Sequence, residues 1–142
     1  MPEISLTKAR AITRGILKKG REMELKPLSV VVLDTGGHVK YFEREDGASP
    51  GRFDIARGKA FGVIMTGMTG TALMKRAEEQ AYFVTALNGA YDGKVIPVPG
   101  GVIVKDGRGR VIGSVGVTGD TSDNDAAAAL AGIEAAGLTG DA

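Results

Sequence analysis

The stretch LSVVVLDTGGHVKYFERED, residues 28–46, decides how this chain folds. Its apolar run Val30–Leu33 is typical of a well-buried β-strand. The next four residues, DTGG, favour a tight turn, and Val39 and Tyr41 then alternate with other residues along a return strand. A phenylalanine directly after Tyr41 breaks this alternation, so we expect the second strand to pack on both faces or to bulge. The stretch therefore predicts a β-hairpin.

A second hairpin is predicted in KVIPVPGGVIVKDGRGRVIGSVGVTGD, residues 94–120. Here Val102–Val104 is expected to pair with Val111–Val117 across the turn Asp106–Gly109. The two prolines before the first of these strands cannot donate ladder hydrogen bonds, which predicts an edge or a loop for that segment. Strands that come in hairpins indicate an antiparallel sheet, and helices must then cover its faces.

Helical spacing of apolar residues predicts four helices around the two hairpins. Ser5 is a plausible cap for the first helix, and Ser122 with Asp125 resembles a capping box at the start of the last. Gly58 and Gly62 lower the intrinsic stability of the second helix and indicate close packing against another element. The order of elements predicts one α+β domain over residues 1–142. The expected helices span about 6–24, 51–67, about 71–88 and 123–137.

The composition excludes several classes of protein. The formal net charge of +1 comes from 18 basic and 17 acidic residues spread along the chain, so neither nucleic acid nor a membrane surface is an expected partner. The absence of cysteine removes disulfides, thiolate nucleophiles and zinc fingers. The first residues lack the apolar core of a signal peptide, and no apolar run is long enough to cross a bilayer. We therefore expect a cytoplasmic protein.

Charged residues directly follow the first hairpin. Arg44 can hold a carboxylate in a two-point grip, and Asp46 can orient that ligand or accept a proton. The alternative is an ion pair at the end of a surface strand. Lys59, in the second helix, is expected to be solvated when only its spacing is considered. The single histidine, His38, is expected to be a solvated turn residue that ligates a metal only if symmetry brings several copies together.

Glycine loops offer a second kind of candidate site. Gly100 and Gly101 can present backbone N–H groups to an anion or an oxyanion, although the segment matches neither a Walker loop nor a dinucleotide fingerprint. Asp125 either caps the last helix or contacts a ligand. No serine lies in a nucleophile-elbow pattern, so a serine–histidine–acid site is not expected.

Four ordered blocks of the chain resemble the GlcG/HbpS family of haem-binding or haem-degrading-domain proteins, relatives of which form the C-terminal part of some cobalamin adenosyltransferases. The resemblance runs from about residue 5 to 137 and implies a profilin- or PAS-like fold, with a five-stranded antiparallel sheet flanked by helices. It also implies a homo-oligomer, from dimer to octamer. The blocks are VVVLDTGGHVKYFEREDGA, DIARGKAFG, VPGGVIVKDGRGRVIGSVGVTG and DNDAAAALAGIEA.

The chain departs from the family pattern in two places. Glu45 stands where a methionine is usual, and FGVIMTGMTG, residues 61–70, replaces a more polar stretch that contains threonine. The second departure makes that part of a pocket more apolar than usual, so the ligand is allowed to differ as well.

The resemblance makes binding of haem or a related tetrapyrrole the leading hypothesis. Arg44 and Lys59 would hold the propionates, Met65–Met68 would contact the ring, and Gly47 with the Gly100–Gly101 loop would complete the pocket. Iron ligation has no motif of its own. The candidate iron ligands are His38, Met65, Met68, Tyr82 or a hydroxyl.

Two other hypotheses remain open at this point. In the first, the protein is an enzyme or accessory protein that acts on a small organic acid in a catabolic pathway. Arg44 and Lys59 would hold the carboxylate, Asp46 or Asp125 would move a proton, and the amides of the Gly100–Gly101 loop would stabilise negative charge. In the second, the glycine loops serve packing between subunits of a structural assembly.

Overall fold

The strands form one antiparallel sheet in the order β2-β1-β4-β3-β5 in the computed structural model, which describes residues 2–142. The predicted α+β class and both predicted hairpins are confirmed, and the hairpins join where β1 pairs with β4. The short last strand, which pairs with β3, has no distinct pattern in the sequence. The strands are β1 (Ser29–Leu33), β2 (Val39–Arg44), β3 (Gly101–Lys105), β4 (Val111–Thr118) and β5 (Thr139–Asp141).

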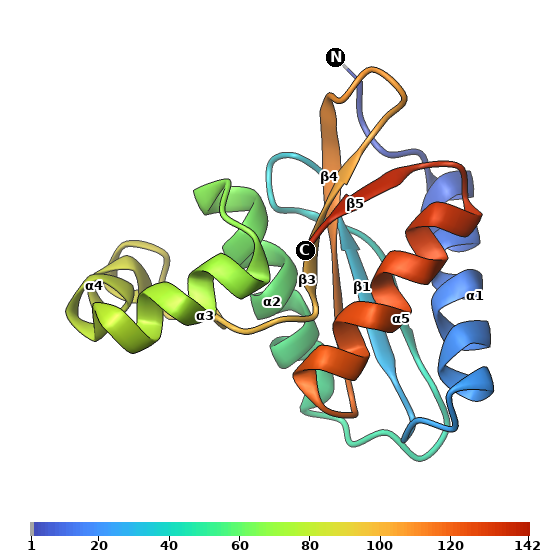
Figure 1. Ribbon diagram of the computed structural model, residues 1–142, viewed down its shortest axis with the longest axis horizontal. Coiled ribbons are helices and arrows are strands. Elements are labelled where there is room, and N and C mark those ends of the chain that lie inside the picture. The colour runs from blue at the N-terminus through green and yellow to red at the C-terminus, as the bar shows by residue number, and fades with distance from the viewer. Residues whose placement is uncertain (1) are drawn as a thin grey trace.

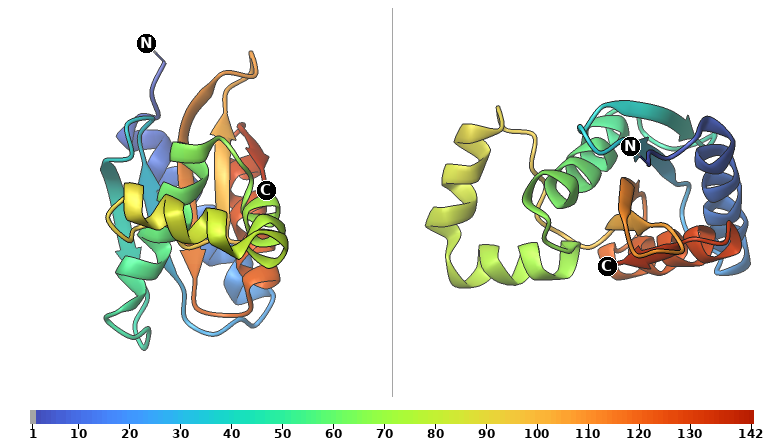
Figure 2. Two further views of the ribbon diagram at one scale, coloured as in Figure 1. Left: turned by 90° about the vertical axis from the view of Figure 1, so that its left-hand side faces the viewer. Right: turned by 90° about the horizontal axis from the view of Figure 1, so that it is seen from above.

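Helices cover both faces of the sheet, as Figure 1 shows. On one face lie α1 (Leu6–Glu22) and α5 (Ser122–Ala135), and on the other lies α2 (Arg52–Thr66). From the end of α2 the chain continues into α3 (Gly70–Glu79) and α4 (Ala81–Ala90), which extend away from the sheet (Figures 1 and 2). No helix within residues 2–142 is both long and apolar enough to span a membrane.

Glycine residues, which have no side chain, let the helices approach their neighbours closely. A Cβ atom on Gly116 of β4 would lie 1.9 Å from the carbonyl oxygen of Ala56, so α2 rests on the sheet backbone. A Cβ on Gly132 of α5 would lie 2.6 Å from the carbonyl oxygen of Ile12, so α1 and α5 meet in the same way. Gly58 and Gly62 pack against the loop that holds Val95 and Ile96, which confirms the close packing expected of this pair.

The return strand β2 packs on both faces, as its sequence predicts. Tyr41 packs against the core under α1, whereas Phe42 faces α2 and meets Phe53 edge to face, with ring centroids 4.8 Å apart. The register of the β1–β2 pair also shifts between Val32 and Leu33. The interrupted alternation therefore reflects a strand with an apolar neighbour on each side.

Two helix boundaries differ from prediction. The helix expected over about 71–88 breaks at Gln80, whose φ of −140° and ψ of 62° are not helical, and it becomes α3 and α4. The last helix is capped by Thr121, whose hydroxyl accepts from Asn124 N–H, so the capping box expected at Ser122 is wrong. Ser5 does cap α1, with its hydroxyl 3.1 Å from Lys8 N.

Candidate functional site

A buried ion pair lies at the end of β4, between the two layers of helices. The Lys59 ammonium of α2 lies 3.2 Å from Oδ2 of Asp125 in α5, and the two side chains are 4% and 1% exposed. The ammonium also donates to the Val117 carbonyl at 3.0 Å, while Oδ1 of Asp125 accepts from Asp120 N–H at 3.0 Å. The pair therefore connects α2, the last residues of β4 and the first turn of α5.

Burial dominates the electrostatics of this pair. Desolvation lowers the pKa of Lys59, and the Asp125 carboxylate opposes that shift. Desolvation likewise raises the pKa of Asp125, opposed by the Lys59 ammonium and by the hydrogen bond from Asp120 N–H. Neither charge is stable in this environment without the other.

The Gly100–Gly101 loop packs around Lys59. Gly100 has a φ of +111°, and a Cβ there would lie 2.9 Å from the Lys59 ammonium. A Cβ on Gly101 would lie 2.2 Å from the Lys59 carbonyl oxygen. The loop needs glycine at both positions because the backbone and the ammonium of Lys59 fill the space that side chains would occupy.

The residues expected to share one ligand cavity do not do so. Lys59, expected on spacing to be solvated and from the resemblance to hold a ligand, is instead buried and satisfied by Asp125. Arg44, at the end of edge strand β2, and Asp46 are both exposed. The arginine near the ion pair is Arg52, which donates to Thr118 Oγ1 at 2.9 Å and whose charge acts on Lys59.

Glu45 and Gly47 have local roles in the same loop. Glu45, which departs from the family pattern, accepts from Leu28 N–H at 2.8 Å and lies 3.6 Å from Arg21. It therefore secures the start of β1 rather than a ligand. Gly47 lines a small cavity of about 230 Å³ beside Arg52 and Gly119.

His38 is a solvated turn residue, as expected, whereas Met65 packs against the same turn. The His38 side chain is 81% exposed, and its Nδ1 lies 3.3 Å from Oδ1 of Asp34. Within residues 2–142 no group of three or more His, Cys, Asp or Glu residues is arranged to hold a metal ion. A Cβ on Gly37 would lie 2.8 Å from Met65 Cε and 3.1 Å from the Phe61 ring, so Met65 packs against this turn.

A cavity of about 620 Å³ opens between the C-terminal end of α2 and the β3–β4 hairpin. We call it the α2–hairpin cavity. Apolar side chains form much of its wall, and two cations stand among them: Lys105, 3.3 Å from Asp141, and Arg110, whose Nε lies 2.8 Å from Asp106. Its lining residues are Pro2, Thr35, Val63, Ile64, Gly67, Ile103, Lys105, Arg110, Val111 and Asp141.

The unusually apolar segment after Lys59 contributes to this cavity. Val63, Ile64 and Gly67 come from the FGVIMTGMTG stretch that departs from the family pattern. Sequence reasoning did not select Lys105 and Arg110, although they flank the predicted turn of the second hairpin. An apolar wall with two cations suits a ligand with a hydrophobic body and one or more carboxylates.

These features define an α+β domain in which helices cover both faces of a five-stranded antiparallel sheet and a largely apolar cavity lies beside α2. The chain belongs to the family described as haem degrading protein HbpS-like, which matches residues 4–134. No curated protein gives a match.

Solved structures share the fold along nearly the whole chain. The complex of PduOC with heme has 21% identity and a TM-score of 0.84, with 96% of each chain covered. The Klebsiella pneumoniae protein ORFY has 23% identity and a TM-score of 0.85, covering 96% of this chain and 92% of its own. A double mutant of HbpS from Streptomyces reticuli has 26% identity and a TM-score of 0.78, covering 94% and 87%.

The ion pair generates a stability prediction. Lys59→Met leaves the Asp125 carboxylate buried without a counterion, so we expect the free energy of unfolding to fall by about 3–5 kcal/mol in urea denaturation. The double variant Lys59→Met/Asp125→Leu removes both charges and should recover most of that loss. A double variant no more stable than the single one would contradict this account of the pair.

Asp120 generates a prediction about pH. Hydrogen bonds from the Asn124 side chain and from the N–H groups of Lys26 and Thr121 lower the pKa of Asp120 to about 2. Because the folded pKa lies below the unfolded value of 3.8, the stabilisation is complete above about pH 4 and is lost as the pH falls toward 2. Thermal unfolding of Asp120→Ala should therefore show a lower Tm than the native chain at pH 7, and the difference should narrow as the pH falls and be smallest below pH 2. Asp46→Ala, which also removes one exposed carboxylate, serves as the control for the loss of one negative charge.

Proposed function

We propose that this protein binds a tetrapyrrole, such as haem, in the α2–hairpin cavity. The observation that carries the proposal is the combination of apolar walls with Lys105 and Arg110 in one cavity. Family membership supports it, as does the heme complex of PduOC, a protein of the same fold. The cavity volume lies within the range of about 300–1,000 Å³ that is typical of sites for small molecules.

The cavity suits the organic part of haem. Val63, Ile64 and Ile103 supply an apolar surface for the macrocycle, and they come from α2 and β3. Lys105 is 32% exposed and Arg110 is 50% exposed, so both can exchange their present carboxylate partners for propionates. In the bound protein, the guanidinium of Arg110 would donate two hydrogen bonds to one propionate in place of its present contact with Asp106.

The same cavity does not suit coordination of iron. Its described lining contains no histidine, cysteine, methionine or tyrosine, the side chains that usually ligate haem iron. Met68 packs against the cluster that contains Val63 and Ile103, and it is not among the lining residues of the cavity. Tyr82 lies on α4 and is 72% exposed. Binding is therefore expected to depend on the macrocycle and its carboxylates rather than on the metal.

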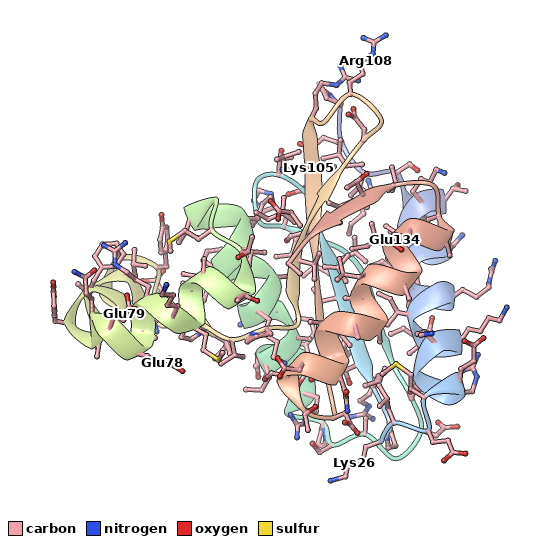
Figure 3. All side chains as sticks on the ribbon, in the orientation of Figure 1. Lys26, Glu78, Glu79, Lys105, Arg108 and Glu134 are labelled. Carbon is pink, nitrogen blue, oxygen red and sulfur yellow. The ribbon has the colours of Figure 1, made fainter. Side chains whose placement is uncertain are left out.

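Titration with hemin and with metal-free protoporphyrin IX tests this proposal. We expect both to bind saturably, one per chain. Because the described lining offers no iron ligand, their dissociation constants should lie within about tenfold of each other, a difference of about 1.4 kcal/mol. Lys105→Gln and Arg110→Gln should each raise the dissociation constants of both porphyrins by about tenfold. Arg108→Gln is the matched control, because Arg108 lies at the tip of the same hairpin and points away from the body (Figure 3).

Three results would contradict the proposal in different ways. If neither porphyrin binds saturably, the function is wrong. If both bind but Lys105→Gln and Arg110→Gln behave like Arg108→Gln, the ligand lies elsewhere. If hemin binds more than about a hundredfold tighter than the free porphyrin, an iron ligand contributes and the account of this cavity is wrong.

We also propose that α3 and α4, the α3–α4 arm, form an interface between copies of the chain. The arm stands off the body (Figure 2), and α4 packs mainly on α3. A ten-residue helix is marginal in water on its own. No residue of α4 is charged, so its exposed face can meet a copy of itself without burying a charge. That face consists of Ala81, Tyr82, Thr85, Ala86, Gly89 and Ala90.

Light scattering coupled to size-exclusion chromatography tests this interface. We expect the native chain to be oligomeric, and we expect Tyr82→Glu/Ala86→Glu to have a lower mass because two buried carboxylates would oppose association. Thr7→Glu, at an exposed position of α1, is the control and should leave the mass unchanged. A monomeric native chain, or a glutamate pair on α4 without effect, would contradict the proposal.

A further inference from the structure

A second groove lies on the opposite side of the sheet from α2, between α1 and the edge strand β2. It encloses about 370 Å³ and takes residues only from these two elements. We call it the α1–β2 groove. Its lining residues are Arg10, Arg14, Leu17, Arg21, Tyr41 and Glu43.

Three arginines share one side of α1. Arg10 and Arg14 are one helical turn apart, and Arg21 lies two turns beyond Arg14, so all three fall on the same face of the helix. Tyr41 stands opposite them. The hydrogen bond from its hydroxyl to Glu43, at 2.6 Å, raises the pKa of Tyr41, and the charges of Arg10 and Arg14 act against that rise. Both arginines line the groove together with this phenol.

Positive charge in the groove is not balanced. Arg21 lies 3.6 Å from Glu45, but within residues 2–142 neither Arg10 nor Arg14 has a carboxylate within 4.0 Å. Glu43 is the one acidic residue of the lining, and its carboxylate already accepts from Tyr41. The excess is local, because the chain as a whole has a formal net charge of +1. Like charges held together repel, and an anion between them removes that repulsion.

We propose that the α1–β2 groove binds a small anion of the di- or triphosphate class. A guanidinium presents a planar fork that pairs with two phosphate oxygens at once. Arg10 and Arg14 are separated by about 6 Å along the helix, which suits successive phosphoryl groups better than a single one. Glu43 faces the same space and offsets part of the positive charge, but the three arginines leave an excess that attracts a ligand with several negative charges most strongly.

The shape of the groove favours a small ligand over a nucleic acid. The helix bounds it on one side and the edge strand on the other, and its lining comes from three turns of one helix and two residues of one strand. This site is independent of the α2–hairpin cavity, since α1 and α2 lie on opposite faces of the sheet (Figure 1). A failure of porphyrin binding in the α2–hairpin cavity would therefore not affect the proposal for the α1–β2 groove, and the reverse also holds.

Isothermal titration calorimetry with inorganic tripolyphosphate, at a constant ionic strength of about 0.15 M, tests the site. We expect saturable binding of one tripolyphosphate per chain. Arg10→Gln/Arg14→Gln should weaken it by at least about tenfold, and Arg10→Lys/Arg14→Lys should weaken it less, because charge is kept while the fork is lost. The control Lys18→Gln/Lys40→Gln removes the same number of charges from exposed positions outside the lining and should change binding by less than about threefold.

Several outcomes would overturn the proposal. The proposal is wrong if titration with tripolyphosphate gives no saturable binding heat while thermal unfolding shows that the chain is folded. An equal loss in Lys18→Gln/Lys40→Gln would mean that diffuse charge on the basic helix is responsible. Orthophosphate or sulfate binding as tightly as tripolyphosphate would mean a nonspecific anion site, and tighter binding of a single-stranded oligonucleotide would mean a nucleic-acid surface.

Discussion

The internal ion pair between Lys59 and Asp125 is the constraint on which the arrangement of this protein depends. The two residues come from helices on opposite faces of the sheet, and they meet at the end of β4. Two charges out of water are tolerated only when they are paired and their remaining hydrogen-bonding groups are satisfied. The Val117 carbonyl and the Asp120 N–H group meet that requirement. The pair therefore sets α2 and α5 in one relative position.

Backbone contact between layers complements this pair. Glycines on β4, α1 and α5 allow the helices to approach the sheet and one another without intervening side chains. With the helices so close, the space for a ligand lies at their ends and edges rather than under them. The α2–hairpin cavity lies where α2 ends, and the α1–β2 groove lies where the sheet ends. One surface is apolar with two cations, and the other is strongly cationic.

The residues expected to act on a small organic acid do not gather around one cavity. Lys59 and Asp125 satisfy each other, Asp46 is exposed, and the Gly100–Gly101 loop is filled by the lysine rather than directed at a cavity. The residues that resembled a catalytic set are thus, apart from Asp46 and Arg44 at the surface, the structural centre of the domain. The α2–hairpin cavity instead combines an apolar wall with two cations that can contact carboxylates.

Local patterns in the sequence were enough for the elements that depend on near neighbours. Turn residues and apolar alternation identified both hairpins, Ser5 marked the start of α1, and the glycine pair in α2 indicated a close contact. The break at Gln80 escaped prediction because the apolar spacing continues across it, and the chain turns there through one non-helical residue. The three residues of β5 were too few to carry a periodic signal.

The sequence by itself determined the fold class and the family, because both rest on patterns that are local or ordered along the chain. Only the tertiary structure decided which charged residues meet. Lys59 pairs with Asp125, 66 residues away, and this distance in the chain carries no spacing rule. Lys105 and Arg110 became cavity residues because α2 ends beside their hairpin. Charge position depends on packing between layers, and packing between distant segments is the part of folding that local sequence does not encode.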